Sequence, residues 1–100
     1  MFVGVAEIAV FIPHSGSLKA KRSVVNSLKG RIRSRYPVSV SEVGDPDVWQ
    51  RAELAVALCG NDAGRVEETL RAIERLANGQ RDGQVVDFRV EVVPWPVTGG

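Results

Sequence analysis

Apolar and polar residues alternate along four segments of the chain, a pattern typical of β-strands. In residues 2–12 both faces are largely apolar despite Glu7, as in a central strand of a sheet. Residues 38–43 alternate β-branched with polar side chains, which predicts an edge strand with one buried face. Residues 52–60 and 84–93 are predicted to form the third and fourth strands. In the fourth strand, the side chains expected to face the core are Val86, Phe88, Val90 and Val92.

Two further segments repeat apolar residues every three or four positions, which is the spacing of one buried helix face. In residues 17–36 the apolar stripe consists of Leu18, Val25, Leu28, Ile32 and Tyr36. Ser17 is suited to cap the start of this helix, and Pro37 is expected to end it. The second helix is expected to begin after Asp62 and to stop at Gly79. Its stripe consists of Val66, Leu70, Ile73 and Leu76.

The order of these elements, β-α-β-β-α-β, is that of the ferredoxin-like fold. Right-handed crossovers then place both helices on one face of an antiparallel sheet with the strand order 4-1-3-2. One hundred residues suffice for one domain, which we assign to residues 1–93, and residues 94–100 are expected to form a loose tail. The sequence therefore predicts an α+β sandwich with one sheet face left free of helices.

Charge is unevenly distributed along the chain. Residues 1–41 carry seven basic side chains and one acidic one, whereas residues 42–100 carry six basic and eleven acidic ones. Such segregation can steer a polyanion to one face, although the two halves can also neutralise each other in the folded domain. With 44% hydrophobic and 25% charged residues, the composition is that of a soluble globular protein.

A ridge of basic side chains runs along one flank of the first predicted helix. We define the ridge by Lys19, Arg22, Lys29 and Arg33. Clustered cations of this kind suit phosphate binding, because each neutralised phosphate releases counterions. Lys21 projects into the apolar stripe, so its ammonium group either extends to solvent from the first turn or is held in place; we include it among the expected phosphate contacts. The alternative is that the acidic residues of the second helix neutralise the ridge; these are Glu67, Glu68 and Glu74.

The helix-free sheet face and one loop are the other candidate binding surfaces. The face offers Phe11 as its single aromatic residue, so base stacking of the kind used by ferredoxin-like RNA readers is not favoured. A flat patch of small residues there suits either solvent or a second copy of the chain; its members are Ala9, Ala55 and Ala57. Trp49 is expected either to cover the core from its loop or to contact a partner.

The sequence gives little support for an enzyme. His14 is the only histidine, and although it could meet Glu42, Asp45 or Asp47 at a metal, we assign no metal site, no cofactor and no catalytic residue. Cys59 is alone, which suits a reducing compartment. Residues 1–12 lack the basic start and cleavage site of a signal peptide, and no segment is long and apolar enough for a membrane helix. We therefore expect a cytoplasmic protein.

Three segments resemble the YlxP-like family of small bacterial proteins. The segment 17–25 matches that family's S-L-K-x-K-R-x-V-V pattern, and residues 38–43 and 47–54 are similar to its strand, loop and strand. The resemblance spans about residues 2–93 and implies a ferredoxin-like fold. It implies no catalytic residues, since that family is uncharacterised. Its genes lie beside those for translation initiation and ribosome-binding factors, which implies ribosomal or other RNA as partner.

Taken together, these patterns favour a non-catalytic RNA- or ribosome-associated binding module. The residues expected to contact phosphates are Lys19, Lys21, Arg22, Lys29 and Arg33, with the loop around His14 adjusting the fit. The alternative is a protein-interaction or homodimerisation domain that uses the small-residue patch or Trp49. A small enzyme using the loop between residues 42 and 51 is the third hypothesis, but it has no reaction that can be named.

Overall fold

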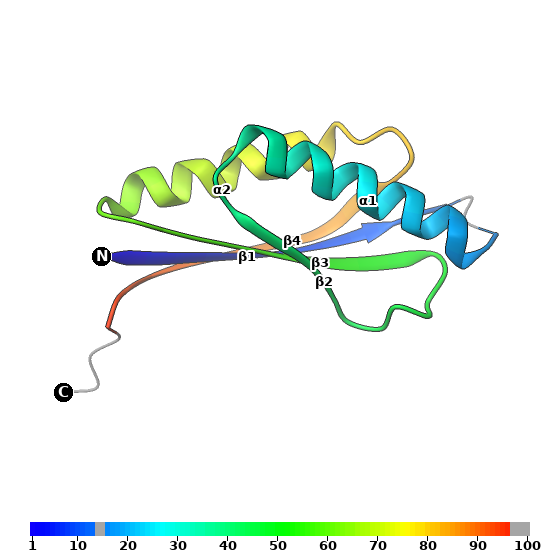
Figure 1. The fold of residues 1–100 in the computed structure, drawn as a ribbon, viewed down its shortest axis with the longest axis horizontal. Helices are drawn as coiled ribbons and strands as arrows, with labels where there is room; N and C mark the ends of the chain where they lie inside the picture. Colours follow the sequence, from blue (N-terminus) through cyan, green and yellow to red (C-terminus); the bar gives the residue numbers. More distant parts are fainter. Residues whose placement is uncertain (14–15, 97–100) are drawn as a thin grey trace.

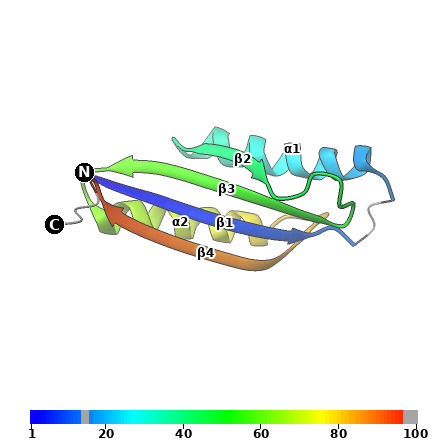
Figure 2. The same ribbon diagram turned by 90° about the horizontal axis from the view of Figure 1, so that it is seen from below.

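The computed structural model describes residues 1–13 and 16–96, and its sheet is built around β1 (Phe2–Phe11). This strand pairs antiparallel with β3 (Arg51–Gly60) on one side and with β4 (Gln84–Pro94) on the other. The short β2 (Ser39–Val43) pairs with the outer side of β3, so the strand order is β2-β3-β1-β4 (Figure 2). This is the ferredoxin-like topology that the sequence pattern predicts.

Both helices cover the same face of this sheet (Figure 1). Seen through the sheet, α1 (Leu18–Arg35) lies on the β2 side and α2 (Ala63–Asn78) lies behind β1 and β4 (Figure 2). The predicted caps are present, because the side chains of Ser17 and Asp62 accept hydrogen bonds from the third backbone N–H after each cap. No helix in the described ranges is long and apolar enough to cross a membrane.

The core lies between the helices and the sheet. Its largest fully buried apolar side chains are Ile8, Leu28, Ile32, Leu54, Leu70, Ile73, Val40 and Val56. Helix α2 approaches β1 most closely at Gly4, where an added Cβ would overlap the side chain of Val66 and lie 2.9 Å from Leu70 Cδ1. The absence of a side chain at Gly4 is therefore what allows this helix to pack directly on the central strand.

The prediction of which β4 side chains face the core is wrong at one position, Val86. Ala9 of β1 is paired with Asp87, but the next residue, Val10, is paired with Val85, so Val86 is bulged out of the ladder. Val86 is consequently 48% exposed, and Val85 packs against the core in its place. Alternation in the sequence continues smoothly through Val86, so it does not reveal the extra residue.

The ends of several strands differ by one residue from the sequence expectation. The largest consequence concerns Pro94, which we assigned to the tail but which is the last residue of β4. The next residue, Trp95, donates its backbone N–H to the carbonyl oxygen of Met1 at 2.8 Å. The two ends of the domain are thereby joined, and the expected tail residues 97–100 lie outside the described ranges.

Candidate nucleic-acid interface

The basic ridge lies along one long flank of α1. Lys19, Arg22 and Arg33 are exposed and Lys29 is half-buried. Arg33 donates from Nη2 to the carbonyl oxygen of Val40 in β2 at 2.7 Å, which places this flank beside the edge strand of the sheet. The helix holding the ridge contains no acidic residue in its 18 positions. The cations of the ridge therefore extend from the first turn of α1 to its last turn, with no acid of the same helix among them.

The acidic residues of α2 do not neutralise this ridge. Glu67 and Glu74 instead form ion pairs with Arg71 of their own helix, at 4.0 and 3.3 Å. Lys19, Arg22 and Lys29 have no ion pair within residues 1–13 and 16–96. The alternative that the second helix neutralises the ridge by direct contact is thus wrong, and these cations remain available to a ligand.

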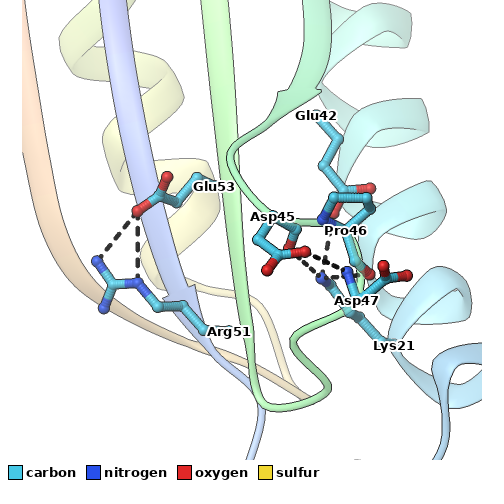
Figure 3. Close-up of polar contacts among 7 residues, drawn as sticks. All are labelled: Lys21, Glu42, Asp45, Pro46, Asp47, Arg51 and Glu53. Carbon is cyan, nitrogen blue, oxygen red and sulfur yellow. Dashed lines mark hydrogen bonds and ion pairs between the residues drawn. The ribbon is translucent and has the colours of Figure 1, made fainter.

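Lys21 is not part of the surface, contrary to its inclusion among the phosphate contacts. Its side chain is buried, with the residue 1% exposed, and Nζ lies 3.3 Å from Glu42 Oε2 (Figure 3). The ammonium group also donates to the carbonyl oxygens of Pro46 and Asp45, at 3.1 and 3.4 Å. Of the two interpretations of Lys21, the structure therefore supports the one in which the ammonium is held inside the fold.

The Lys21 contacts fasten the loop between β2 and β3 to α1. The same loop turns at Gly44, whose φ of 82° lies in the left-handed region, and Asp47 donates its backbone N–H to Asp45 Oδ1 at 2.9 Å (Figure 3). Trp49 follows on this loop and is 50% exposed. Trp49 is thus a large apolar residue that an anchored loop leaves partly exposed.

The helix-free sheet face is less open than its small residues suggest. Ala9 is only 6% exposed, so it does not belong to an accessible partner surface. It is paired with Glu53 on one side and Asp87 on the other, and ion pairs join these acids to arginines at 3.4 Å (Arg51–Glu53) and 3.2 Å (Asp87–Arg89). Of the predicted patch, Ala55 is half-buried and Ala57 is exposed.

The family to which the chain belongs follows from comparison with known proteins. The model of the family described as "Protein of unknown function (DUF503)" matches residues 3–90. The chain belongs to the DUF503 family. Over 71 residues this DUF503 chain is 34% identical to the uncharacterised protein YlxP of Bacillus subtilis strain 168, a match that covers 71% of the chain and 77% of YlxP. The resemblance stated from the sequence segments is therefore confirmed.

Two solved structures are similar to this DUF503 domain. One is a de novo designed protein with a ferredoxin fold, with a TM-score of 0.46, 12% identity and coverage of 93% of this chain and 84% of the designed chain. The other is the periplasmic domain P4 of SecDF, with a TM-score of 0.42, 18% identity and coverage of 89% and 87%. The description of the DUF503 family names no activity.

The sequence did not show which residues of α2 lie next to the flank of α1 opposite the ridge in the DUF503 domain. Arg31 and Arg35 lie on that flank, and Arg31 donates from Nη1 to Gln80 Oε1 at 2.6 Å. Arg75 of α2 lines the same hollow as both of them. A helical wheel separates the two flanks of each helix, but it does not show which flanks meet.

Proposed function

We propose that this DUF503 domain is a non-catalytic RNA-binding module that contacts phosphates through the ridge of α1. The observation that carries the proposal is that Lys19, Arg22 and Lys29 form no ion pair with any described residue. Cations left without acidic partners on one rigid helix offer regularly spaced donors to a phosphate backbone. Ribosomal RNA is the structured RNA that we propose as the first ligand to test.

The distribution of charge over the folded domain supports the same proposal. The open sheet face carries four acids, Glu7, Glu53, Asp87 and Glu91, against two arginines, Arg51 and Arg89. The helical face carries the acid-free α1 together with α2, whose three acids are matched by three arginines. A polyanion is therefore steered toward the helices, and its contacts there position the RNA backbone without reading base sequence.

Binding to a structured RNA is expected to weaken steeply with salt. In a series from about 50 to about 200 mM salt, log K should fall with log salt by somewhat less than one unit per contacted phosphate. The double variant Arg22→Gln/Lys29→Gln should bind about tenfold more weakly and lower that slope by about two, since each cation contributes about one. Fluorescence anisotropy with labelled ribosomal RNA fragments measures both quantities.

The matched control is Arg71→Gln/Arg89→Gln, which removes the same formal charge from exposed positions outside the ridge. Arg71 is paired with Glu67 and Glu74, and Arg89 lies on the open sheet face paired with Asp87. This control should retain the parent affinity and slope. Equal binding by the ridge variant and the parent, or equal losses in ridge variant and control, would refute the ridge as the RNA-binding surface.

A homodimer formed through the open sheet face is the second proposal. Val5 and Ala57 are directly opposite each other in the β1–β3 ladder, and Val5 is 42% exposed. An apolar pair in this position can pack against the same pair of a second copy. Sedimentation should then show a mass that rises with protein concentration, and Ala57→Arg should abolish the rise. A parent protein that sediments as a monomer at all concentrations would exclude the dimer.

A further inference from the structure

A groove between α1 and α2 gathers arginines that the ridge does not contain. We call it the arginine groove and define it by Arg31, Arg35, Arg65 and Arg75. It consists of two adjoining hollows of about 520 and 360 Å³ that share Tyr36, Ala72 and Arg75 as lining. The two hollows are lined by a single acid, Glu68. Arg65 and Arg75 line the larger hollow, Arg31, Arg35 and Arg75 line the smaller one, and only one acid lies among them.

These guanidinium groups are not neutralised by the fold. Arg31 has a neutral partner, the Gln80 amide oxygen at 2.6 Å, which fixes its direction without cancelling its charge. For the side chains of Arg35, Arg65 and Arg75, no hydrogen bond or ion pair joins them to any residue in the described ranges. The positive charges of these arginines therefore remain available to an anion.

Support of the helix ends explains only part of the cluster. Arg35 and Arg75 lie in the last turns of α1 and α2, where a cation interacts favourably with the helix dipole. Arg65 lies in the first turn of α2, three residues after the Asp62 cap, where the dipole disfavours a cation. The Asp62 carboxylate caps this turn and accepts the Arg65 backbone N–H at 3.1 Å, but within the described residues no ion pair joins it to the Arg65 guanidinium. Stabilisation of a helix end therefore does not explain an arginine at position 65.

We propose that the arginine groove is a phosphate-binding site, separate from the ridge, that takes closely spaced phosphate groups. Guanidinium groups bind phosphate oxygens through paired hydrogen bonds, and two adjoining hollows that share Arg75, with one or two further arginines in each, suit a ligand with two or three linked phosphates. Such phosphates occur in the tail of a nucleoside polyphosphate or along a nucleic-acid strand. The ridge and the groove lie on opposite flanks of α1, so each can be occupied without the other.

The first test is titration of the parent protein with inorganic tripolyphosphate at fixed ionic strength, in the absence of divalent metal, by calorimetry and by thermal denaturation. Tripolyphosphate should bind and raise the melting temperature, because a ligand that binds only the folded state stabilises it. Arg65→Gln/Arg75→Gln should weaken this binding by about tenfold or more, since it removes two charge-assisted contacts. Sulfate at equal ionic strength should give a much smaller shift.

The control is Arg71→Gln, which changes an arginine of the same helix that lies outside the groove and is paired with its own acids. It should bind tripolyphosphate as the parent does. Without ligand, Arg65→Gln alone should melt at the parent temperature or slightly above it, whereas a purely structural role for Arg65 predicts a lower temperature. Absence of tripolyphosphate binding by the parent, or an equal loss in Arg71→Gln, would overturn the proposal.

Competition then identifies the source of the phosphates. Displacement of tripolyphosphate by ATP but not by a short single-stranded RNA assigns the groove to a small ligand, and displacement by that RNA in the Arg22→Gln/Lys29→Gln background assigns it to a strand. The groove does not rest on the ridge proposal. If the parent protein binds tripolyphosphate but no RNA, the groove proposal stands and the ridge proposal is refuted. If it binds RNA but no tripolyphosphate, only the groove proposal is refuted.

Discussion

Lys21→Met should lower the free energy of unfolding by about 3 kcal/mol, the lower end of the range for breaking a buried ion pair. Methionine retains the apolar stem of the lysine but removes three contacts of the ammonium group, to Glu42 and to the carbonyl oxygens of Asp45 and Pro46. Glu42 Oε2 is buried and has no hydrogen-bond partner in the described part of the chain, so the ion contact to Lys21 is its only compensation. Removal of Lys21 therefore leaves a charge without a partner.

Urea denaturation followed by circular dichroism measures this loss, and Lys19→Met is the matched control. Lys19 lies two residues earlier on the same helix and is exposed, so the same substitution there should change stability by less than about 0.5 kcal/mol. The double variant Lys21→Met/Glu42→Gln should recover part of the loss, because the unpaired carboxylate is then removed as well. A Lys21→Met protein as stable as Lys19→Met would show that the buried contacts contribute nothing.

Gly4→Ala is expected to destabilise the domain by about 2 kcal/mol, a typical result of overpacking a core. A Cβ at this position would overlap the Val66 side chain and crowd Leu70 at 2.9 Å, so α2 must shift away from β1. The cost arises at the contact between the central strand and the second helix. Any shift there also disturbs the core side chains that the helix carries.

Gly30→Ala, the same substitution at another position, is expected to change the stability of the domain in the opposite direction. Gly30 lies within α1 and has open space around its Cβ position, with nothing within 4 Å. Alanine there should stabilise the protein by about 0.5 to 1 kcal/mol, because glycine is a poor helix former. Melting temperatures of the two variants should therefore move in opposite directions. A Gly4→Ala variant that melts with or above the parent would contradict the close packing described.

The sequence predicted those features of the fold that depend on local periodicity. Element order and the caps at Ser17 and Asp62 are confirmed, since each is encoded within a few neighbouring residues. Sheet order is also confirmed, because right-handed crossovers derive it from the order of the elements. The bulge at Val86 was missed because it arises from how β4 pairs with β1. Periodicity in one strand carries no information about a register shift against another strand.

The candidate site was predictable only in part, for a similar reason. The helical wheel correctly separated the exposed ridge from the apolar stripe, and it placed Lys21 on that stripe. It could not show that Glu42 and the carbonyl oxygens of a loop some 24 residues away would surround the ammonium group. The prediction that Ala9 is accessible was wrong for the same reason, because the charged residues beside it, Glu53 and Asp87, belong to two neighbouring strands. Long-range contacts decide whether a charged or small side chain is accessible.

The hydrogen bond from Arg33 to Val40 has a consequence for aggregation. Strand β2 is only five residues long and has a neighbour on one side, so its outer backbone groups could pair with a strand of another molecule. Arg33 already occupies the carbonyl oxygen of Val40 in this strand, and its guanidinium group places a positive charge there. Pairing of a foreign strand with β2 would have to displace this hydrogen bond, so a side chain from a helix makes this edge a less favourable place to extend the sheet.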